Sequence, residues 1–387
     1  MAIVHMQQIN ILYLIDHFHR AGGTENHLAR LVTSLDRSTF NCTVVTFDFA
    51  DNPCSDLIKD SGIEFLHIPV GRYYTFDALK KAVLLSRIIR EKKIDIVQTF
   101  HIKSDFYGTI VARMSGITNI ISSKRDTGDL KSPWHLFLNK LVSWIPRTFI
   151  VVAEEVGRVV VKKEGVASNK LLTIYNGIDR QKFNVPSDKE KQAAKSWLGF
   201  SDTDFVVGTV AWLRPEKNYQ GFFDAVKKAS EKIPNLKAVA VGGDGDGSQL
   251  EFFKQYVSRA GITDRVLFAG QVHDVRPFLK SFDVACLVPS GNEGFSNSII
   301  EKMAMGLPVV VSDVGGNSEA VEDGYNGFVL SENNSGMLAK ALIFLAEHPD
   351  ERKEMGIRST QRVKELFTLE GMIEAHEKLY KAIMVYR

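Results

Sequence analysis

One stretch decides the fold of this chain: Glu293-Gly-Phe-Ser-Asn-Ser-Ile-Ile-Glu301, then Lys302-Met-Ala-Met-Gly-Leu-Pro308 and the apolar run Val309–Val311. The apolar run is typical of a fully buried parallel strand, and the residues before it predict a helix. A second Gly-rich turn, at Gly315 and Gly316, follows the strand and opens another short helix. Because doubly wound folds bind ligands at the carboxyl ends of parallel strands, we expect a ligand site here.

Two carboxylates frame this expected site. Glu293 and Glu301 are eight positions apart, and since a helix turns about 100° per residue they share one side, roughly 12 Å apart along the axis. That distance is too long for a shared proton, but it suits two anchors for different hydroxyls of one extended ligand. Between them lies a turn at a helix N-terminus, where anions are favoured: Gly294, Phe295, Ser296, Asn297 and Ser298. The alternative is that both glutamates are ordinary solvated acids.

The stretch resembles the signature of the retaining glycosyltransferases of family 4, which have the two-domain GT-B fold. Its elements stand in the same order: E-x(7)-E, G-x-P-V-V, G-G-x-x-E and G-x-x-G-x-x-V. The last is Gly324-Tyr-Asn-Gly327-Phe-Val-Leu330 here, with leucine in place of the final valine. The resemblance covers most of the chain and is densest from Val207 to Leu330. It implies an α/β architecture of two Rossmann-like, doubly wound parallel-sheet domains facing a cleft.

The resemblance also implies roles for the residues of this stretch. The C-terminal domain would bind a nucleotide-diphosphate sugar as donor substrate, a UDP-sugar or a GDP-sugar, with no other cofactor. Glu301 would hold the ribose hydroxyls, Glu293 the hydroxyls of the donor sugar, and the Gly294–Ser298 turn would help to bind the leaving diphosphate. A saccharide or lipid-linked acceptor would enter from the N-terminal domain. Attack from the face that the nucleotide leaves would retain the anomeric configuration, with the diphosphate as base.

The composition is that of an ordinary globular protein with room for two domains. The chain has 387 residues, 44% of them hydrophobic and 24% charged, and its net charge of +2 argues neither for nor against a polyanionic partner. We expect no nucleic-acid partner.

The cysteines Cys42, Cys54 and Cys286 form no zinc or disulfide pattern, which fits a reducing compartment. No apolar run approaches the roughly 20 residues that span a bilayer. We therefore expect a cytoplasmic protein without a signal peptide, at most peripheral at the inner face of the membrane.

Strand-like and helix-like segments alternate along the chain, which predicts parallel sheets with helices on both faces. The predicted strands are Ile9–Ile15, Thr43–Phe47, Phe65–Val70, Ile94–Thr99, Ile120–Ser122, Thr148–Val152, Leu172–Tyr175, Phe205–Val210, Ala238–Val241, Val266–Ala269, Val284–Val288 and Pro308–Ser312. We expect an acceptor-binding domain over residues 1–183 and a nucleotide-sugar-binding domain over 184–366. By resemblance, a last helix over 367–387 crosses back to pack on the first domain.

A basic turn, Arg214-Pro-Glu-Lys217, follows the apolar segment Val207–Leu213. A transferase without a metal needs cations at the leaving diphosphate, because negative charge develops there as the glycosidic bond breaks. Lys217 matches the lysine that the family uses in this role. The usual arginine of the family is replaced by Trp212. Arg214 lies two residues on, and residues at this spacing share one face of an extended chain, so Arg214 is the candidate to supply the missing charge. The alternative for Arg214 and Lys217 is a solvated basic turn.

Two further segments follow predicted strands of the first half. Gly22 and Gly23 let the backbone turn tightly and approach a ligand closely, and the resemblance implies that they border the donor diphosphate or the acceptor. An ordinary turn is the alternative. His101 stands one position after the usual place of a family histidine, and by resemblance it contacts the donor sugar. For His101 the alternative is a structural histidine that caps the next helix.

The stretch from Ser132 to Trp144 has apolar residues at helical spacing: Trp134, Phe137, Leu138, Leu141 and Trp144. This pattern predicts a helix that either packs on the core or touches a bilayer surface, and the core is the favoured interpretation. Shortly before it, Ser122-Ser-Lys124-Arg125-Asp126 resembles an acceptor-facing loop, with a solvated turn as the alternative.

Two Asp-x-Asp triplets, Asp202-Thr-Asp204 and Asp244-Gly-Asp246, are of the kind that holds a metal ion in another transferase architecture. Such triplets are common by chance, and we expect no metal. The loop around Asp244 lacks the third glycine of the dinucleotide fingerprint, which disfavours a nicotinamide dehydrogenase. Two other functions stay open. One is a relative that epimerises or hydrolyses a sugar nucleotide without an acceptor. The other is a catalytically silent binding subunit, which Trp212 makes conceivable.

Overall fold

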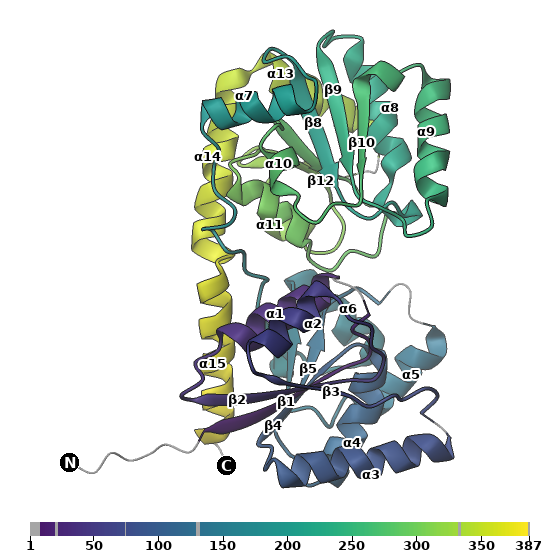
Figure 1. The fold of residues 1–387 in the computed structure, drawn as a ribbon, viewed down its shortest axis with the longest axis vertical. Coiled ribbons are helices and arrows are strands. Elements are labelled where there is room, and N and C mark those ends of the chain that lie inside the picture. Colours follow the sequence, from purple (N-terminus) through teal and green to yellow (C-terminus); the bar gives the residue numbers. More distant parts are fainter. Residues whose placement is uncertain (1–7, 20–21, 74, 129–131, 332–333, 386–387) are drawn as a thin grey trace, which may run out of the picture. The chain divides into compact units, whose positions relative to one another are not determined.

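A computed structural model describes residues 8–19, 22–73, 75–128, 132–331 and 334–385. The chain folds as two compact units, one made of the residues up to Asn176 together with those from Glu370 onward, the other of Gly177–Leu369. Each unit is a parallel sheet with helices on both faces (Figure 1). The predicted architecture of two doubly wound, Rossmann-like domains is therefore confirmed.

The N-terminal domain has a seven-stranded sheet in the order β3-β2-β1-β4-β5-β6-β7, with neighbouring strands parallel. Its strands are β1 (Ile9–Ile15), β2 (Phe40–Thr46), β3 (Glu64–His67), β4 (Ile96–Phe100), β5 (Ile120–Lys124), β6 (Thr148–Val151) and β7 (Leu171–Thr173). Its helices are α1 (Gly23–Ser34), α2 (Pro53–Asp60), α3 (Phe76–Glu91), α4 (Thr109–Met114), α5 (Pro133–Val142) and α6 (Glu154–Glu164), with a short π-helix η1 (Ser104–Gly108) and a 3₁₀ turn η2 (Ser168–Lys170). Because parallel crossovers are right-handed, α1 and α2 cover one face and α3 to α6 the other.

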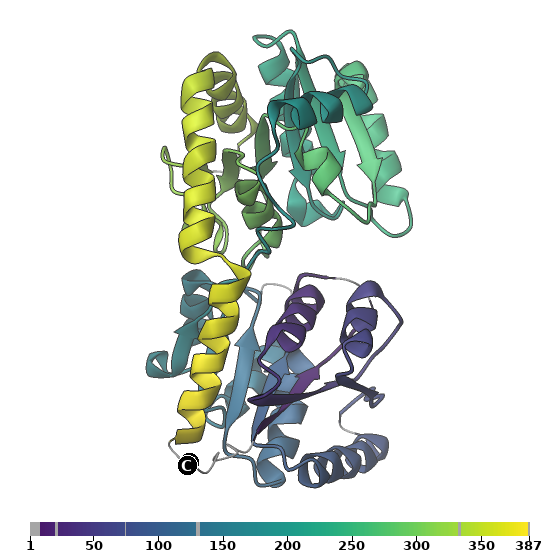
Figure 2. The same ribbon diagram turned by 60° about the vertical axis from the view of Figure 1, so that its left-hand side comes forward.

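The helix α15 (Leu369–Val385) completes the N-terminal domain beside α1 (Figure 2). Tyr380 is fully buried and donates a hydrogen bond of 2.6 Å to Gln98 in β4, while Tyr13 in β1 donates one of 3.2 Å to Tyr380. The ring of His376 lies 5.6 Å from that of His27 in α1. Since buried polar groups need partners, these contacts make α15 part of the core of this domain.

The C-terminal domain has a six-stranded sheet in the order β10-β9-β8-β11-β12-β13, with neighbouring strands parallel. Its strands are β8 (Phe205–Val210), β9 (Leu236–Val241), β10 (Val266–Gly270), β11 (Val284–Leu287), β12 (Val309–Ser312) and β13 (Gly327–Leu330). Its helices are α7 (Asp188–Trp197), α8 (Tyr219–Ser230), α9 (Ser248–Ala260), α10 (Arg276–Leu279), α11 (Asn297–Ala304), α12 (Asn317–Ala320), α13 (Ser335–Glu347) and α14 (Pro349–Leu366), with short turns η3 (Pro215–Lys217) and η4 (Thr263–Arg265).

The central strands of this second sheet are apolar on both faces, because helices cover both. Val207, Val284 and Val310 are fully buried in one core that the helices α8 and α13 close. Gly208 in β8 packs against the ring of Phe282, where a Cβ atom would stand 2.0 Å from ring carbons. Only glycine lets the ring lie flat on the sheet at this position.

Each predicted strand has a counterpart in the structure, and β1 and β8 have the predicted bounds. Sequence patterning missed β13, a strand of four residues that begins at the second glycine of the G-x-x-G-x-x-V motif. All three cysteines are free and buried. In the part of the chain that the structure describes, no helix is both long and apolar enough to cross a membrane.

The favoured interpretation of the segment around α5 is wrong. The face of α5 that packs on the domain consists of Leu138, Asn139 and Val142. Four of the five apolar residues that predicted a core-facing helix are exposed instead: Trp134, Phe137, Leu141 and Trp144. The helix is apolar on both sides, so its periodicity did not identify the buried one.

Candidate functional site

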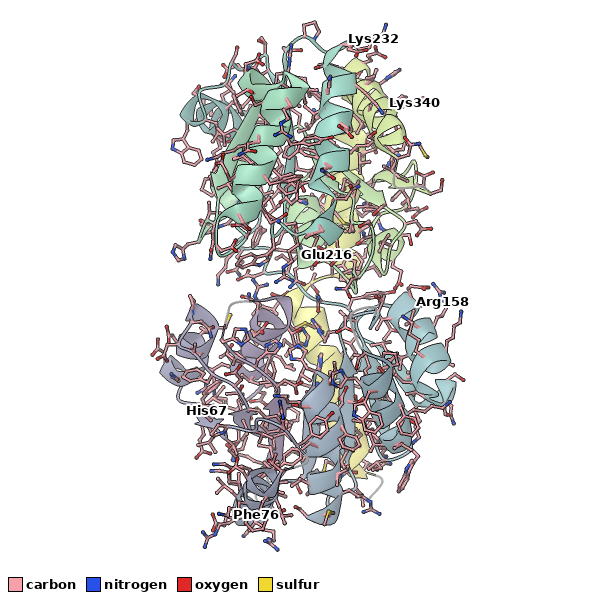
Figure 3. All side chains as sticks on the ribbon, turned by 90° about the vertical axis from the view of Figure 1, so that its right-hand side faces the viewer. His67, Phe76, Arg158, Glu216, Lys232 and Lys340 are labelled. Carbon is pink, nitrogen blue, oxygen red and sulfur yellow. The ribbon has the colours of Figure 1, made fainter. Side chains whose placement is uncertain are left out.

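Candidate residues of the C-terminal domain gather at the carboxyl ends of its central strands. β8 and β11 are neighbours, and the chain leaves them in opposite directions, toward β9 and toward β12. This is the position at which doubly wound sheets bind ligands. The turn after β8 carries Lys217 and the loop after β11 carries Glu293. Figure 3 locates this end of the domain. Glu216, next to Lys217, lies there, and Lys232, which follows α8, lies at the other end.

Lys217 and Glu293 form an ion pair in this region. The ammonium nitrogen of Lys217 lies 2.6 Å from a carboxylate oxygen of Glu293, and the two side chains are only 18% and 10% exposed. The backbone N–H of Ser290 donates to the carbonyl of Glu216 (2.8 Å), which ties the two loops together. A charge-assisted contact this short, between side chains largely shielded from water, holds both of them in fixed orientations. It offers a cation for phosphate oxygens and, beside it, a carboxylate for sugar hydroxyls.

The Gly-rich turn after β12 is locked onto the loop that carries Glu293. The N–H of Gly316 donates to the carbonyl of Gly294 at 2.7 Å. Gly315 has a φ of +58°, and a Cβ atom on it would stand 1.9 Å from the carbonyl oxygen of Glu293. Both the left-handed backbone and the close approach require glycine. The Gly-rich turn and the loop with Glu293 therefore form one structural unit.

The helix α11 starts directly beside the ion pair. Its first N–H groups lack intrahelical acceptors and carry the positive end of the helix dipole. The hydroxyl of Ser298 donates to the carbonyl of Val210 at the end of β8 (2.7 Å), which fixes the start of the helix over the sheet. Ser296, Asn297 and Glu301 are half-buried. The turn can therefore present N–H groups and hydroxyls to an anion, with Glu301 one turn further along.

Two other predicted ligand residues are Phe295 and Arg214. Phe295 is buried, with its ring 5.3 Å from that of Phe367, so its side chain belongs to the core and only its backbone faces the loop. The side chain of Arg214 is 40% exposed and lies 3.9 Å from Glu216. Its guanidinium lies 5.9 Å from the ring centre of Trp212. Arg214 is thus near the pair in sequence, while its described partners are its own neighbours.

Sequence reasoning missed Lys302. Its side chain is fully buried and its ammonium donates to the carbonyl of Cys286 at the end of β11 (3.0 Å). Burial lowers the pKa of Lys302 to about 8, against the opposing effect of Glu301 and Glu293. A lysine on the apolar face of a predicted helix was the available signal, because a buried ammonium is costly and seldom kept without a role.

The N-terminal domain brings three imidazoles together at the carboxyl ends of β1 and β4. The ring of His17 stacks on that of His101, with centres 4.4 Å apart and planes at 23°, and His19 lies 4.9 Å from His17. Nδ1 of His17 lies 3.0 Å from Oε1 of Glu25 in the first turn of α1. Burial tends to raise the pKa of Glu25, but the hydrogen bonds with His17 and with its own backbone N–H, together with the charges of His101 and His17, outweigh it, and the pKa lies below its ordinary value. Sequence reasoning named His101 here and missed the other members.

The backbone at His101 is strained. Its φ is +73°, a left-handed conformation that costs an L-residue roughly 1–2 kcal/mol. The segment after it is held by Asp16, whose carboxylate accepts the N–H groups of Lys103 (2.7 Å) and Ser104 (2.6 Å). Burial raises the pKa of Asp16 to about 6 despite these hydrogen bonds. Strain of this kind persists only where the surroundings enforce it, which is common at functional sites.

Gly22 makes room for Glu25. A Cβ atom on Gly22 would stand 2.4 Å from a carboxylate oxygen of Glu25. The carbonyl of Gly22 accepts hydrogen bonds from the backbone and the side chain of Asn26, at 3.0 and 2.9 Å. Gly23 is the exposed first residue of α1. The two glycines therefore shape the helix start next to the imidazoles.

Two loops that the sequence left open have structural roles. Lys124 is buried and contacts Asp105 at 2.7 Å and Glu164 at 2.6 Å, so a solvated turn is wrong for this residue. Asp244 accepts the N–H groups of Gln249 (2.6 Å) and Leu250 (2.9 Å), which caps the first turn of α9. Among the residues that the structure describes, no group of three or more His, Cys, Asp or Glu is placed to hold a metal ion.

Known families match the two domains one after the other. Residues 21–182 match Glycosyltransferase Family 4, and residues 190–362 match Glycosyl transferases group 1. Together these matches cover most of the chain.

Two bacterial glycosyltransferases are among the relatives of the chain. Over 305 residues the chain is 29% identical to the UDP-Gal:alpha-D-GlcNAc-diphosphoundecaprenol alpha-1,3-galactosyltransferase of Escherichia coli, a match that covers 75% of this chain and 76% of that protein. It is 30% identical over 220 residues to the lipopolysaccharide core biosynthesis mannosyltransferase LpsB of Rhizobium meliloti strain 1021, covering 54% of this chain and 60% of that protein.

Solved structures share the whole architecture. The Anabaena protein Alr3699/HepE in complex with UDP superimposes with a TM-score of 0.86 at 21% identity, covering 97% of this chain and 100% of that one. At this level of identity the likeness shows the fold alone. The GT-B fold implied by the sequence motifs is thereby confirmed.

Proposed function

The chain belongs to the family 4 glycosyltransferases with a group 1 C-terminal domain, and we propose that it moves a sugar from a nucleotide-diphosphate donor to an acceptor with retention of configuration. The observation that carries this proposal is the ion pair of Lys217 and Glu293 beside the N-terminus of α11. A donor of this class has phosphates for the ammonium and for the helix N-terminus, and sugar hydroxyls for the carboxylate.

The proposed roles follow the chemistry of each group. Lys217 and Arg214 neutralise the leaving diphosphate, with N–H groups of the Gly294–Ser298 turn as further donors. Glu293 holds the donor-sugar hydroxyls and Glu301 the ribose. His101 contacts the donor sugar from the N-terminal domain. The diphosphate itself takes the proton of the attacking acceptor hydroxyl on the same face, so the transfer needs no metal and no protein nucleophile.

Gly22 and Gly23 are proposed to border the donor diphosphate or the acceptor. The exposed position of Gly23 and the imidazoles around His101 support this assignment. They lie at the carboxyl ends of β1 and β4, where a doubly wound domain binds its ligand.

We favour a UDP-sugar as donor and a lipid-linked saccharide as acceptor. The Escherichia coli relative is named for UDP-galactose and for an acceptor on diphosphoundecaprenol, and Alr3699/HepE is seen with UDP and with UDP-glucose. An acceptor of this kind is anchored in a bilayer, so the enzyme would work in the cytoplasm at the inner face of the membrane. The three free cysteines fit that compartment. Its product would belong to cell-envelope polysaccharide.

The first test is thermal unfolding of the pure protein with UDP, GDP, ADP or CMP. We expect UDP to raise the midpoint, because a ligand at about 100 times its dissociation constant adds roughly 2.7 kcal/mol to the folded state. The Lys217→Ala variant, which lacks the ammonium for the phosphates, should lose most of this shift while keeping the midpoint of the free protein within a few degrees.

Product analysis completes the test. With a UDP-sugar and a saccharide acceptor, the sugar should appear on the acceptor and not as free sugar. Release of free or epimerised sugar without acceptor would identify an acceptor-independent enzyme instead. A protein that responds to no nucleotide and transfers nothing contradicts the proposal and points to a silent relative that has lost its phosphate-binding residues.

A further inference from the structure

Large apolar side chains project into solvent from two helices of the N-terminal domain. On α3 these are Phe76, Leu79 and Val83, and on α5 and the turn after it they are Trp134, Phe137, Leu141 and Trp144. Each is between 50% and 74% exposed. We call these seven residues the α3–α5 surface.

The fold of the domain does not require these side chains. α3 already buries Ala78, Leu85 and Ile89 against the core. A helix on the surface of a globular protein needs one apolar face, and its opposite face is normally polar. In α3 the exposed residues recur three and four positions apart, so they form a second apolar stripe. Stripes of this kind mark contact with another surface.

Both helices belong to the same layer of the domain. α3 packs against α4, and α5 packs against the π-helix η1 that leads into α4, all on one face of the sheet (Figure 1). The hydroxyl of Ser115 after α4 donates to that of Ser86 in α3 (2.8 Å), and the neighbouring Met114 is 82% exposed. Phe76 stands at the outer margin of the domain (Figure 3). The two stripes therefore belong to the layer of helices that covers this face of the N-terminal sheet.

The same segments carry a net positive charge. Residues 71–93 contain seven Lys or Arg and two Asp or Glu, a net charge of +5. Residues 132–153 contain Lys140 and Arg147 and no acidic residue, a net charge of +2. Since the whole chain has a net charge of +2, the remainder carries −5. The charge that flanks the α3–α5 surface is thus opposite to that of the rest of the protein.

This combination selects one kind of occupant. Apolar stripes with tryptophans at both ends of α5 and flanking lysines and arginines match the interface of a bilayer that contains anionic lipids. Face-to-face pairing of two copies would bring two positively charged surfaces together, which opposes association. A neutral apolar partner would leave the basic residues without a role.

We propose that the α3–α5 surface docks the enzyme onto a bilayer that contains anionic lipids, with its apolar side chains in the headgroup region. The inference deepens the proposed function and rests on it for the acceptor, because a lipid-linked acceptor must be met at a membrane. Lipid binding itself requires neither donor nor acceptor. It can therefore be measured separately from the response to UDP.

Flotation of the full-length protein with vesicles tests the proposal. We expect binding to vesicles of phosphatidylglycerol and phosphatidylethanolamine to be at least about tenfold tighter than to phosphatidylcholine, and weaker at high salt. The paired variants Phe76→Ser with Leu79→Ser, and Trp134→Ser with Trp144→Ser, should each weaken binding at least about tenfold. A matched control is Phe252→Ser with Ile357→Ser, at 47% and 52% exposure in the C-terminal domain, which should bind as the parent does.

Fluorescence gives a second readout in the same samples. Trp134 and Trp144 should be quenched by brominated lipid, whereas Trp197 and Trp212 in the C-terminal domain should not. Variants that keep the midpoint shift with UDP are folded, so a loss of flotation in them supports the proposal. Parent-like flotation of both α3 and α5 variants would overturn it. The proposal would also be overturned if the parent protein does not bind anionic vesicles, or if it self-associates through these residues instead.

Discussion

The two domains differ in which residues have a left-handed backbone near their candidate functional side chains. Four non-glycine residues in the described ranges have a positive φ: Lys93, His101, Asn218 and Asn292. In the C-terminal domain the left-handed residues are asparagines that stand next to Lys217 and Glu293, and asparagine tolerates this conformation. In the N-terminal domain the candidate residue His101 is itself left-handed.

This difference decides what a substitution does in each domain. At Glu293 a new side chain changes the chemistry and leaves the backbone preference almost untouched. At His101 a new side chain changes both the imidazole and the fit to a left-handed backbone. In the C-terminal domain, free energy is lost instead through the burial of the Lys302 ammonium. Beside its candidate site the C-terminal domain thus buries an ammonium, whereas the N-terminal domain has a strained backbone at His101.

The largest expected effect is at Glu293. Glu293→Ala should lower kcat/KM about 10²-fold, because the donor sugar loses the carboxylate that positions it and a misplacement of about 1 Å can cost that much. Steady-state kinetics with a UDP-sugar measure it, and far-ultraviolet circular dichroism checks the fold. Glu293→Gln keeps the size of the side chain and serves as the matched control for packing. Near-normal turnover of the alanine variant would place the site elsewhere.

An intermediate effect is expected at Lys302. The pKa of Lys302 is about 8 in the folded state, below that of an unfolded lysine, so the unfolded chain binds more protons between about pH 8 and 10.5. The parent should therefore gain stability as pH rises through that window. Lys302→Met removes the buried charge and should stabilise by about 1–3 kcal/mol at pH 7. Its advantage over the parent should fade toward pH 10.

Denaturant unfolding of both proteins at several pH values measures this difference. Parallel stability curves for the parent and Lys302→Met across the window would show that the buried ammonium carries no such cost. The contrast between the two domains would then be lost.

The smallest expected effect separates two variants at His101. His101→Ala and His101→Gly both remove the imidazole and should lose activity equally. Glycine accepts a φ of +73° without strain, so His101→Gly should be more stable than His101→Ala by about 1 kcal/mol. Urea midpoints measured side by side test this. An alanine variant as stable as the glycine variant would mean that the backbone relaxes and His101 is unstrained.

Prediction from sequence succeeded where neighbours in space are also neighbours in the chain. The fold class and the loop with Glu293 could be predicted because one apolar strand and two glycine turns stand in a row. Glu25 lies 3.0 Å from His17, and His17 stacks on His101. That group depends on β1 pairing with β4. Strand order is a property of the whole sheet, and no local pattern reveals it.

Periodicity also failed where a helix has two apolar sides. Leu138 and Phe137 are adjacent and both apolar, yet Leu138 is buried and Phe137 is 50% exposed. A hydrophobic pattern reports that a side chain avoids water, and it does not report which surface removes the water. Lys302 was missed for the opposite reason, since a charged residue is expected at the surface.

The chain builds its N-terminal domain from residues on both sides of the C-terminal domain. A ribosome therefore finishes β1 to β7 before it has made any of α15. At about 5–20 residues per second, the intervening domain takes on the order of 10–40 s to synthesise. During that time Tyr13 and Gln98 lack the hydroxyl of Tyr380, and the sheet beside α1 is uncovered. The domain that is made first is the one that is finished last.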